Sequence, residues 1–138
     1  MANQDDVRRI ASSLPSTTPW PKGFGFSVRN GNKEKGFVWV WQERITPKKP
    51  RVPNPEVLAV RVADLDEKDA LLALDPEKFF TEPHYSGFPA VLVRLRAVAA
   101  GELRALITAA WRCQAPRALA DELEGRRKSP TPKAKRGR

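Results

Sequence analysis

Residues 75–96 read DPEKFFTEPHYSGFPAVLVRLR, and this stretch decides the fold. Its last part, residues 91–96, alternates apolar side chains on a period of two, which predicts a half-buried β-strand. The preceding residues 81–89 are rich in turn formers, because Pro83 and Pro89 fix φ while Gly87 permits angles that other residues resist. We therefore expect a rigid connector that leads into a strand.

This connector carries the only histidine and the only tyrosine of the chain, His84 and Tyr85, side by side. Binding residues concentrate on loops that a rigid scaffold holds in place. The pair is therefore the first place to look for a site.

Upstream of this stretch, the pattern predicts a helix followed by strands. Residues 5–14 place apolar side chains at helical spacing, and Pro15 ends that helix. Residues 16–21 are expected to be a linker loop. Two strands, residues 24–29 and 36–41, flank Asn30-Gly31, which is a strong hairpin signal.

The remaining elements follow from caps and prolines. Residues 42–55 contain four prolines and are expected to form an exposed, stiff, basic loop rather than a strand. A third strand is expected at residues 56–62, and Asp64 begins a helix with a capping-box spacing. A strong helix is expected at residues 100–113, and Pro116 is suited to open a short final helix.

These elements predict an α+β domain with two layers. The expected order is α-β(3)-α-β(2)-α plus a short C-terminal helix. Tight hairpins favour an antiparallel sheet, with the helices packed on one face.

Two blocks of residues also carry a resemblance to a known family. Phe79-Phe80, followed by Pro83-His84-Tyr85, Gly87 and the run from Pro89 to Leu95, resembles the core motif of the MmcQ/YjbR family. The block Ala110-Trp111 and Ala115-Pro116-Arg117 resembles the closing element of that family. The resemblance spans roughly residues 5–123. It implies a YjbR-like fold, similar to secretion chaperones and CyaY-like, in a largely uncharacterised bacterial family with a proposed DNA-binding role.

Charge divides the chain into a domain and a tail. The net charge is +9, but residues 126–138 hold seven Lys or Arg and no acid, which leaves 18 basic against 16 acidic residues elsewhere. We expect residues 1–125 to form the domain and residues 126–138 to be a disordered basic tail. One cysteine, no signal pattern and no long apolar run lead us to expect a cytoplasmic monomer without membrane contact.

Nucleic acid is the partner that the basic residues favour, with DNA bound at low sequence specificity. The first hairpin and the proline-stiffened loop would act as two wings against phosphates, and the tail would add non-specific attraction. The candidate nucleic-acid-binding residues are Arg29, Lys33, Lys35, Lys48, Lys49, Arg51, Arg94 and Arg96.

Two other functions stay open at this point. Aromatic residues could line a pocket for a flat small molecule, such as a drug or metabolite. The candidate pocket residues are Trp39, Trp41, His84, Tyr85 and Trp111. A protein-interaction module is the other alternative.

Catalysis and cofactors are not expected. A nucleophile pair of Cys113 and His84 is conceivable, but a small buried cysteine on a packing helix is the more common arrangement. A single histidine without paired ligands argues against a metal site. We therefore expect no enzyme activity, no metal and no cofactor.

Overall fold

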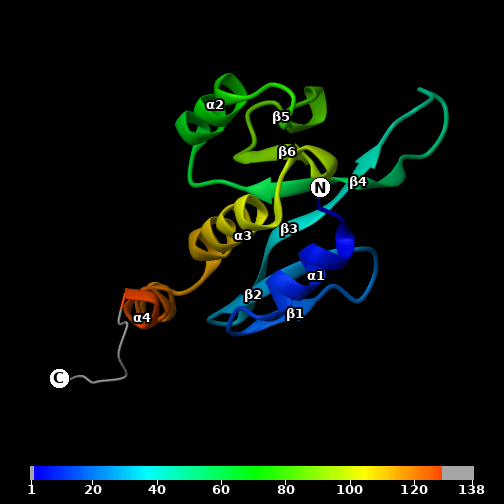
Figure 1. Cartoon of the computed structure of the whole chain (residues 1–138). Helices are drawn as coiled ribbons and strands as arrows, with labels where there is room; N and C mark the ends of the chain where they lie inside the picture. Colours follow the sequence, from blue (N-terminus) through cyan, green and yellow to red (C-terminus); the bar gives the residue numbers. More distant parts are fainter. Residues whose placement is uncertain (1, 129–138) are drawn as a thin grey trace.

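The computed structural model describes residues 2–128 and contains one six-stranded antiparallel sheet in the order β1-β2-β3-β4-β6-β5 (Figure 1). The strands are β1 (Thr17–Pro19), β2 (Gly25–Asn30), β3 (Lys33–Glu43), β4 (Val52–Arg61), β5 (Phe79–Phe80) and β6 (Ala90–Arg94). The helices are α1 (Gln4–Ser12), α2 (Leu65–Leu74), α3 (Ala100–Gln114) and α4 (Arg117–Lys128), with two 3-10 turns, η1 (Pro83–Tyr85) and η2 (Leu95–Ala97).

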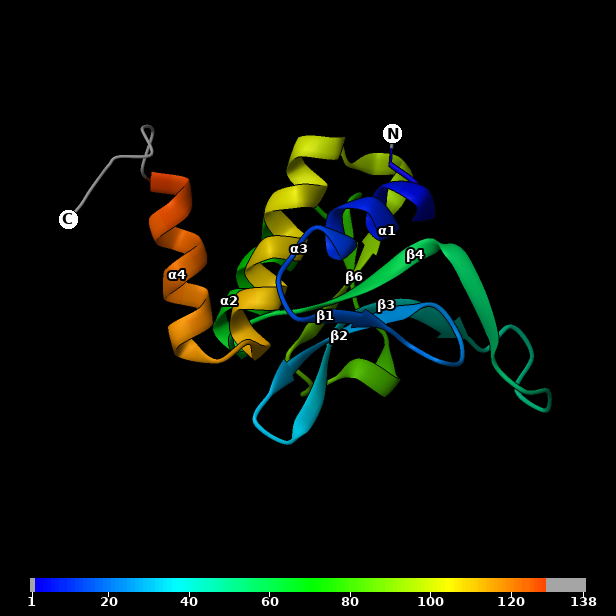
Figure 2. The ribbon, with the colours of Figure 1, turned by 90° about the horizontal axis from the view of Figure 1, so that it is seen from below.

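Helices α1 and α3 lie on the same side of the sheet (Figure 2). The main core fills the space between these layers, and its largest fully buried side chains include Trp111 and Ile107 of α3 and Phe37 of β3. The predicted α+β class, with an antiparallel sheet and helices, is confirmed.

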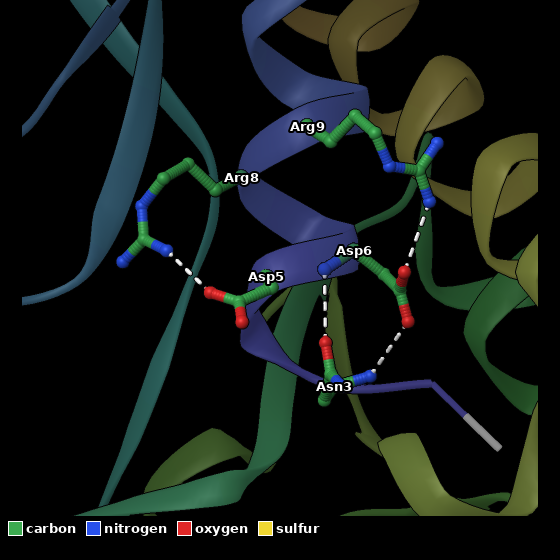
Figure 3. Close-up of polar contacts among 5 residues, drawn as sticks. All are labelled: Asn3, Asp5, Asp6, Arg8 and Arg9. Atoms are coloured by element: carbon green, nitrogen blue, oxygen red, sulfur yellow. Dashed lines mark hydrogen bonds and ion pairs between the residues drawn. The ribbon is translucent and has the colours of Figure 1, made fainter.

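Helix α1 begins with a reciprocal cap. Asn3 Oδ1 accepts a hydrogen bond from the Asp6 N–H at 3.0 Å, and Asp6 Oδ2 accepts one from the Asn3 N–H at 3.1 Å (Figure 3). The hydrogen bond from the Arg9 side chain lowers the pKa of the Asp6 carboxyl most, and the hydrogen bond from the Asn3 backbone N–H lowers it further. The backbone N–H groups of Asn3 and Asp6 thereby both have hydrogen-bond acceptors. The helix presents Val7 and Ile10 to the core.

The hairpin between β2 and β3 forms as predicted. Asn30 pairs with Lys33, so the loop is the two residues Gly31 and Asn32, and Gly31 has φ of +65°. That angle is in the left-handed region that two-residue hairpin loops require.

Two predictions about strands are wrong. Residues 16–21 contain β1, which was expected to be a loop; its three residues are too few to display a periodic pattern. Residues 42–55 are not all loop, because β3 extends to Glu43 and β4 begins at Val52 and includes Pro53 and Pro55. These prolines are tolerated because β6 pairs with β4 only from Val57 onward, so this part of β4 has a free edge.

The expected basic tail lies mostly outside the described residues. Helix α4 continues to Lys128, past the boundary expected at residue 125, and residues 129–138 are not described. Among the helices of residues 2–128, none combines the length and apolar character needed to span a bilayer.

Candidate functional site

The side of the sheet opposite α1 and α3 is lined by aromatic side chains. Register pairs Trp39 of β3 with Ala59 of β4, and Ala59 with Leu92 of β6, so one row of side chains crosses the sheet. Gly25 of β2 and Phe80 of β5 extend this row at its two ends. We call this surface the aromatic face, with ring residues Trp20, Trp39, Trp41, Phe80, Tyr85 and Phe88.

Trp20 lies flat over two glycines. A Cβ added at Gly25 would come within 2.5 Å of the Trp20 ring, and one at Gly36 within 2.9 Å. The indole N–H donates to Ser27 Oγ at 2.8 Å, and the ring stacks on Trp39 with centroids 5.9 Å apart and an interplanar angle of 16°. The absence of side chains at the two glycines therefore creates the space in which Trp20 supports Trp39.

The connector, residues 81–89, buries its Tyr85 in one cluster with Ala59 and Leu92 of the row. Its Tyr85 hydroxyl accepts a hydrogen bond from Trp39 Nε1 at 3.1 Å, and burial raises the pKa of the Tyr85 phenol. Gly87 has φ of +79°, which allows the tight turn after η1. The connector thus brings its aromatic residues against those of β3.

A buried lysine of α2 binds the backbone of the connector. Lys68 of α2 is only 4% exposed, and its Nζ donates to the carbonyl oxygens of Tyr85 at 2.6 Å and Phe88 at 2.9 Å. Burial lowers the pKa of the Lys68 ammonium. Burying a charged group is unfavourable unless it is paired, and these two carbonyls supply the compensation.

These contacts leave a small open cavity of about 260 Å³, lined by Trp39, His84, Tyr85 and Phe88. His84 is exposed, and Phe88 is 39% exposed. The guanidinium of Arg61 lies 5.2 Å from the centre of the Phe88 ring.

The structure brings together most of the aromatic residues predicted from the sequence, with one exception. Trp39, His84 and Tyr85 meet at the cavity, and Trp41 contacts Phe80 nearby on the same face, with ring centroids 5.4 Å apart. Trp111 does not join them. It is fully buried in the core under α3, where its Nε1 donates to Pro15 O at 3.0 Å.

Three residues of this site were missed from the sequence: Trp20, Arg61 and Phe88. Trp20 lies in a segment expected to be a loop, and its signal was the pair of glycines that face it across the hairpin. Phe88 lies inside the connector itself, beside the residues that were predicted.

The predicted basic wings lie at opposite ends of β3. The tip of the β2–β3 hairpin carries Lys33 and Lys35, and the loop after Glu43 carries Lys48 and Lys49. Lys33 and Lys35 lie in the first three residues of this 11-residue strand, which is about 34 Å long at the usual rise per residue, and Lys48 lies in the loop past its other end. Both ends bend toward the side of the sheet away from α1 and α3 (Figure 2).

The eight predicted basic residues divide into two groups by their contacts. The side-chain ammonium groups of Lys33, Lys35, Lys48 and Lys49 form no hydrogen bond or ion pair with any residue in the range 2–128. Their charges are therefore available to a partner.

The four arginines are already engaged within the protein. Arg29 pairs with Glu34 at 3.1 Å, and Arg96 pairs with Glu56 at 3.2 Å. Arg51 donates to Gln42 O at 2.7 Å and lies 3.7 Å from Glu82 Oε2, while Arg94 donates to Pro76 O and Glu77 O and lies 4.2 Å from the Phe80 ring centre. These arginines stabilise local structure, so the lysines are the better candidates for binding phosphate.

Titratable side chains do not gather into a metal centre in the part of the chain that the structure describes: His, Cys, Asp and Glu form no group of three or more there that could hold a metal ion. Cys113 lies at the surface, but neighbouring atoms partly shield its thiol from water, and this desolvation raises the thiol pKa. A raised pKa opposes formation of the thiolate, which is the reactive form.

Comparison with known proteins identifies relatives. The family model described as YjbR matches residues 12–113. Similar relatives are the uncharacterized proteins Mb2600 of Mycobacterium bovis and Rv2570 and MT2646 of Mycobacterium tuberculosis, each 39% identical over 123 residues, which cover 86% of this chain and 93% of theirs.

A solved structure has the same fold. The crystal structure of the Deinococcus radiodurans protein DR2400, a DUF419 domain, has a TM-score of 0.61 and 20% identity, and the match covers 90% of this chain and 89% of that one. At this identity the likeness concerns the fold alone.

Proposed function

This chain belongs to the YjbR family, and we propose that it is a non-enzymatic protein that binds DNA through two lysine pairs, Lys33–Lys35 and Lys48–Lys49. The observation that carries this proposal is the set of four uncompensated lysines at the two ends of one strand.

The spacing of the two pairs suits a duplex. The strand that begins at the first pair and leads to the loop of the second is about 34 Å long at the usual rise, and one turn of B-DNA is about 34–36 Å. Each pair would therefore meet the phosphate backbone about one turn from the other. Such contacts fix the position of a protein on DNA but read no sequence, so low specificity is expected.

The non-enzymatic part of the proposal rests on the chemistry of the side chains. Catalysis by acid and base needs convergent titratable groups. His84 stands in an aromatic wall with Tyr85 as its ring contact, and the Cys113 thiol has a raised pKa. Both features suit packing and binding better than nucleophilic chemistry.

The experiment measures the affinity of the full chain for a labelled duplex of about two turns by fluorescence anisotropy, over a series of salt concentrations. Each phosphate contact contributes about −0.9 to the slope of log affinity against log salt. The double variants Lys33→Ala/Lys35→Ala and Lys48→Ala/Lys49→Ala should therefore each make the slope less negative by about 1.8 units and weaken binding at low salt.

A matched control removes two positive charges from the helical layer. Arg104→Ala/Arg117→Ala changes exposed residues of α3 and α4 and leaves the sheet intact. If the control and the two lysine variants lose affinity equally, the effect is one of net charge only, and the assignment to the lysine pairs is wrong. A chain that ends at Lys128 separates the contribution of residues 129–138.

A further inference from the structure

Resting on the proposed function, we propose that the cavity on the aromatic face takes one unpaired base of a single-stranded nucleic acid, whose phosphates are held by the two lysine pairs. The lysines alone would hold any phosphate polymer. The aromatic cavity adds a reason to prefer strands whose bases are accessible.

The walls of the cavity suit a flat ring system. Trp39 and Phe88 have centroids 6.4 Å apart and planes inclined by 60°, and Tyr85 and His84 complete the lining. Bases of single strands stack on such aromatic side chains. At about 260 Å³, the cavity is smaller than the roughly 300–1,000 Å³ typical of sites for drug-sized ligands. It is better matched to one base presented by a polymer than to a free ligand of that size.

The rings are held in place before any ligand arrives. Trp39 is stacked on Trp20 and donates to the Tyr85 hydroxyl, and Lys68 binds the backbone on both sides of the exposed turn. A preformed wall loses little conformational freedom on binding, which favours affinity. These contacts distinguish the cavity from a chance gap between unsupported side chains.

An unsatisfied donor lies beside the cavity. The Nε of Arg61 is buried and has no hydrogen-bond partner among the described residues, while the same guanidinium packs on the Phe88 ring. A buried donor without a partner is costly unless it is used. A base carbonyl or phosphate oxygen arriving at Phe88 would provide an acceptor.

Charge complementarity identifies the occupant as nucleic acid rather than an apolar peptide. Trp39 lies six residues along β3 from Lys33, about 20 Å at the usual rise, with the other lysine pair beyond the opposite end of the strand. A strand laid along β3 would therefore meet positive charge on both sides of the cavity. In a duplex the bases are paired and stacked, so the rings cannot reach their faces.

The test compares four labelled probes of equal length with the full chain: single-stranded DNA, single-stranded RNA of the same sequence, duplex DNA, and an abasic DNA strand. The variants are Phe88→Ala and His84→Ala, which truncate exposed side chains. Leu74→Ala is the control, because Leu74 is a 74% exposed apolar residue that does not line the cavity.

Loss of one base–aromatic stack costs about 1–3 kcal/mol, which corresponds to a roughly 5- to 160-fold loss of affinity for a single strand. We expect this loss for Phe88→Ala, and a smaller one for His84→Ala, on the DNA or RNA strand that binds. Duplex and abasic affinities should not change. The ratio between the DNA and RNA probes shows which polymer the site prefers.

Three outcomes overturn the inference. If Phe88→Ala and His84→Ala bind single strands as Leu74→Ala does, while the lysine variants lose affinity, the cavity takes no base and the proposed function stands alone. If the lysine variants bind every probe normally, both proposals fail. If a free nucleoside binds saturably and with the same affinity as the single strand, the inference also fails, because the cavity would then be a site for a small molecule.

Discussion

Replacing Lys68 by methionine tests whether one buried ammonium group holds the connector in place. Methionine keeps a long apolar stem of similar shape, so the packing of α2 against the sheet is largely retained. The variant loses the hydrogen bonds from Nζ to Tyr85 O and Phe88 O.

The magnitude follows from what each carbonyl retains. Tyr85 O still accepts the Phe88 N–H at 3.0 Å, and Phe88 O still accepts the Ala90 N–H at 2.8 Å, so neither oxygen is left without a donor. Hydrogen bonds from a charged group are worth about 1.5–3 kcal/mol each. Removing the ammonium also removes its desolvation penalty, which the lowered Lys68 pKa reveals. We expect a net loss of about 2 kcal/mol in the free energy of unfolding.

The assay is urea denaturation followed by circular dichroism and by tryptophan fluorescence. With a slope of about 2 kcal/mol per molar urea, the midpoint should fall by about 1 M with the slope unchanged. Lys22→Met is the matched control, because Lys22 is exposed and its side chain forms no described hydrogen bond or ion pair, and its midpoint should not move.

A loss below about 0.5 kcal/mol, the range typical of surface substitutions, would refute the reasoning. In that case the connector would be held by Tyr85 and the glycine turn, and Lys68 would merely fill space. A normal midpoint combined with weakened single-strand binding would instead locate its effect in the cavity.

Two further perturbations test the aromatic face. Tyr85→Phe removes the acceptor of the Trp39 N–H and should cost about 1 kcal/mol of unfolding free energy at pH 7. Because burial raises the phenol pKa in the folded protein, the phenol of the unfolded wild-type chain ionises first as pH rises through about 10, and wild-type stability falls there. The difference in urea midpoint between wild type and variant should therefore narrow from pH 7 to pH 11. A gap that stays constant would contradict a buried, neutral phenol. Gly25→Ala puts a Cβ within 2.5 Å of the Trp20 ring and should cost about 1–3 kcal/mol through overpacking, whereas Gly101→Ala, with nothing within 4 Å in α3, should stabilise by about 0.5–1 kcal/mol. Equal urea midpoints for the two alanine variants would show that the close contact at Trp20 does not constrain the fold.

Local patterns predicted much of the fold. The period-two run predicted at residues 91–96 is a strand as far as Arg94, where a 3-10 turn takes over, and Asn30-Gly31 lies at a two-residue hairpin. Asp64 caps α2, with its Oδ1 accepting the Glu67 N–H at 2.8 Å. In each case the signal is contained within a few neighbouring residues, and no distant part of the chain is needed to interpret it.

Features that depend on distant partners were harder to predict. A proline-rich segment resembles a loop, and Pro53 and Pro55 are compatible with a strand only because β6 stops short of them. Trp111 and Trp39 are both tryptophans next to apolar residues, and only the tertiary packing decides that one enters the core and the other the aromatic face. The basic residues were likewise identified as a class, but which of them have internal partners required the structure.

The short outer strands have a consequence for self-association. An exposed strand edge is a template on which another chain can add a strand, and natural sheets limit this by keeping edge strands short or placing proline in them. Here β1 has three residues and ends in Pro19, and β5 has two residues. The section of β4 that extends past β6 contains Pro53 and Pro55, each of which lacks a backbone donor. The sheet therefore offers little backbone for intermolecular pairing, which favours the expected monomer and protects the protein from strand-mediated aggregation when it is concentrated.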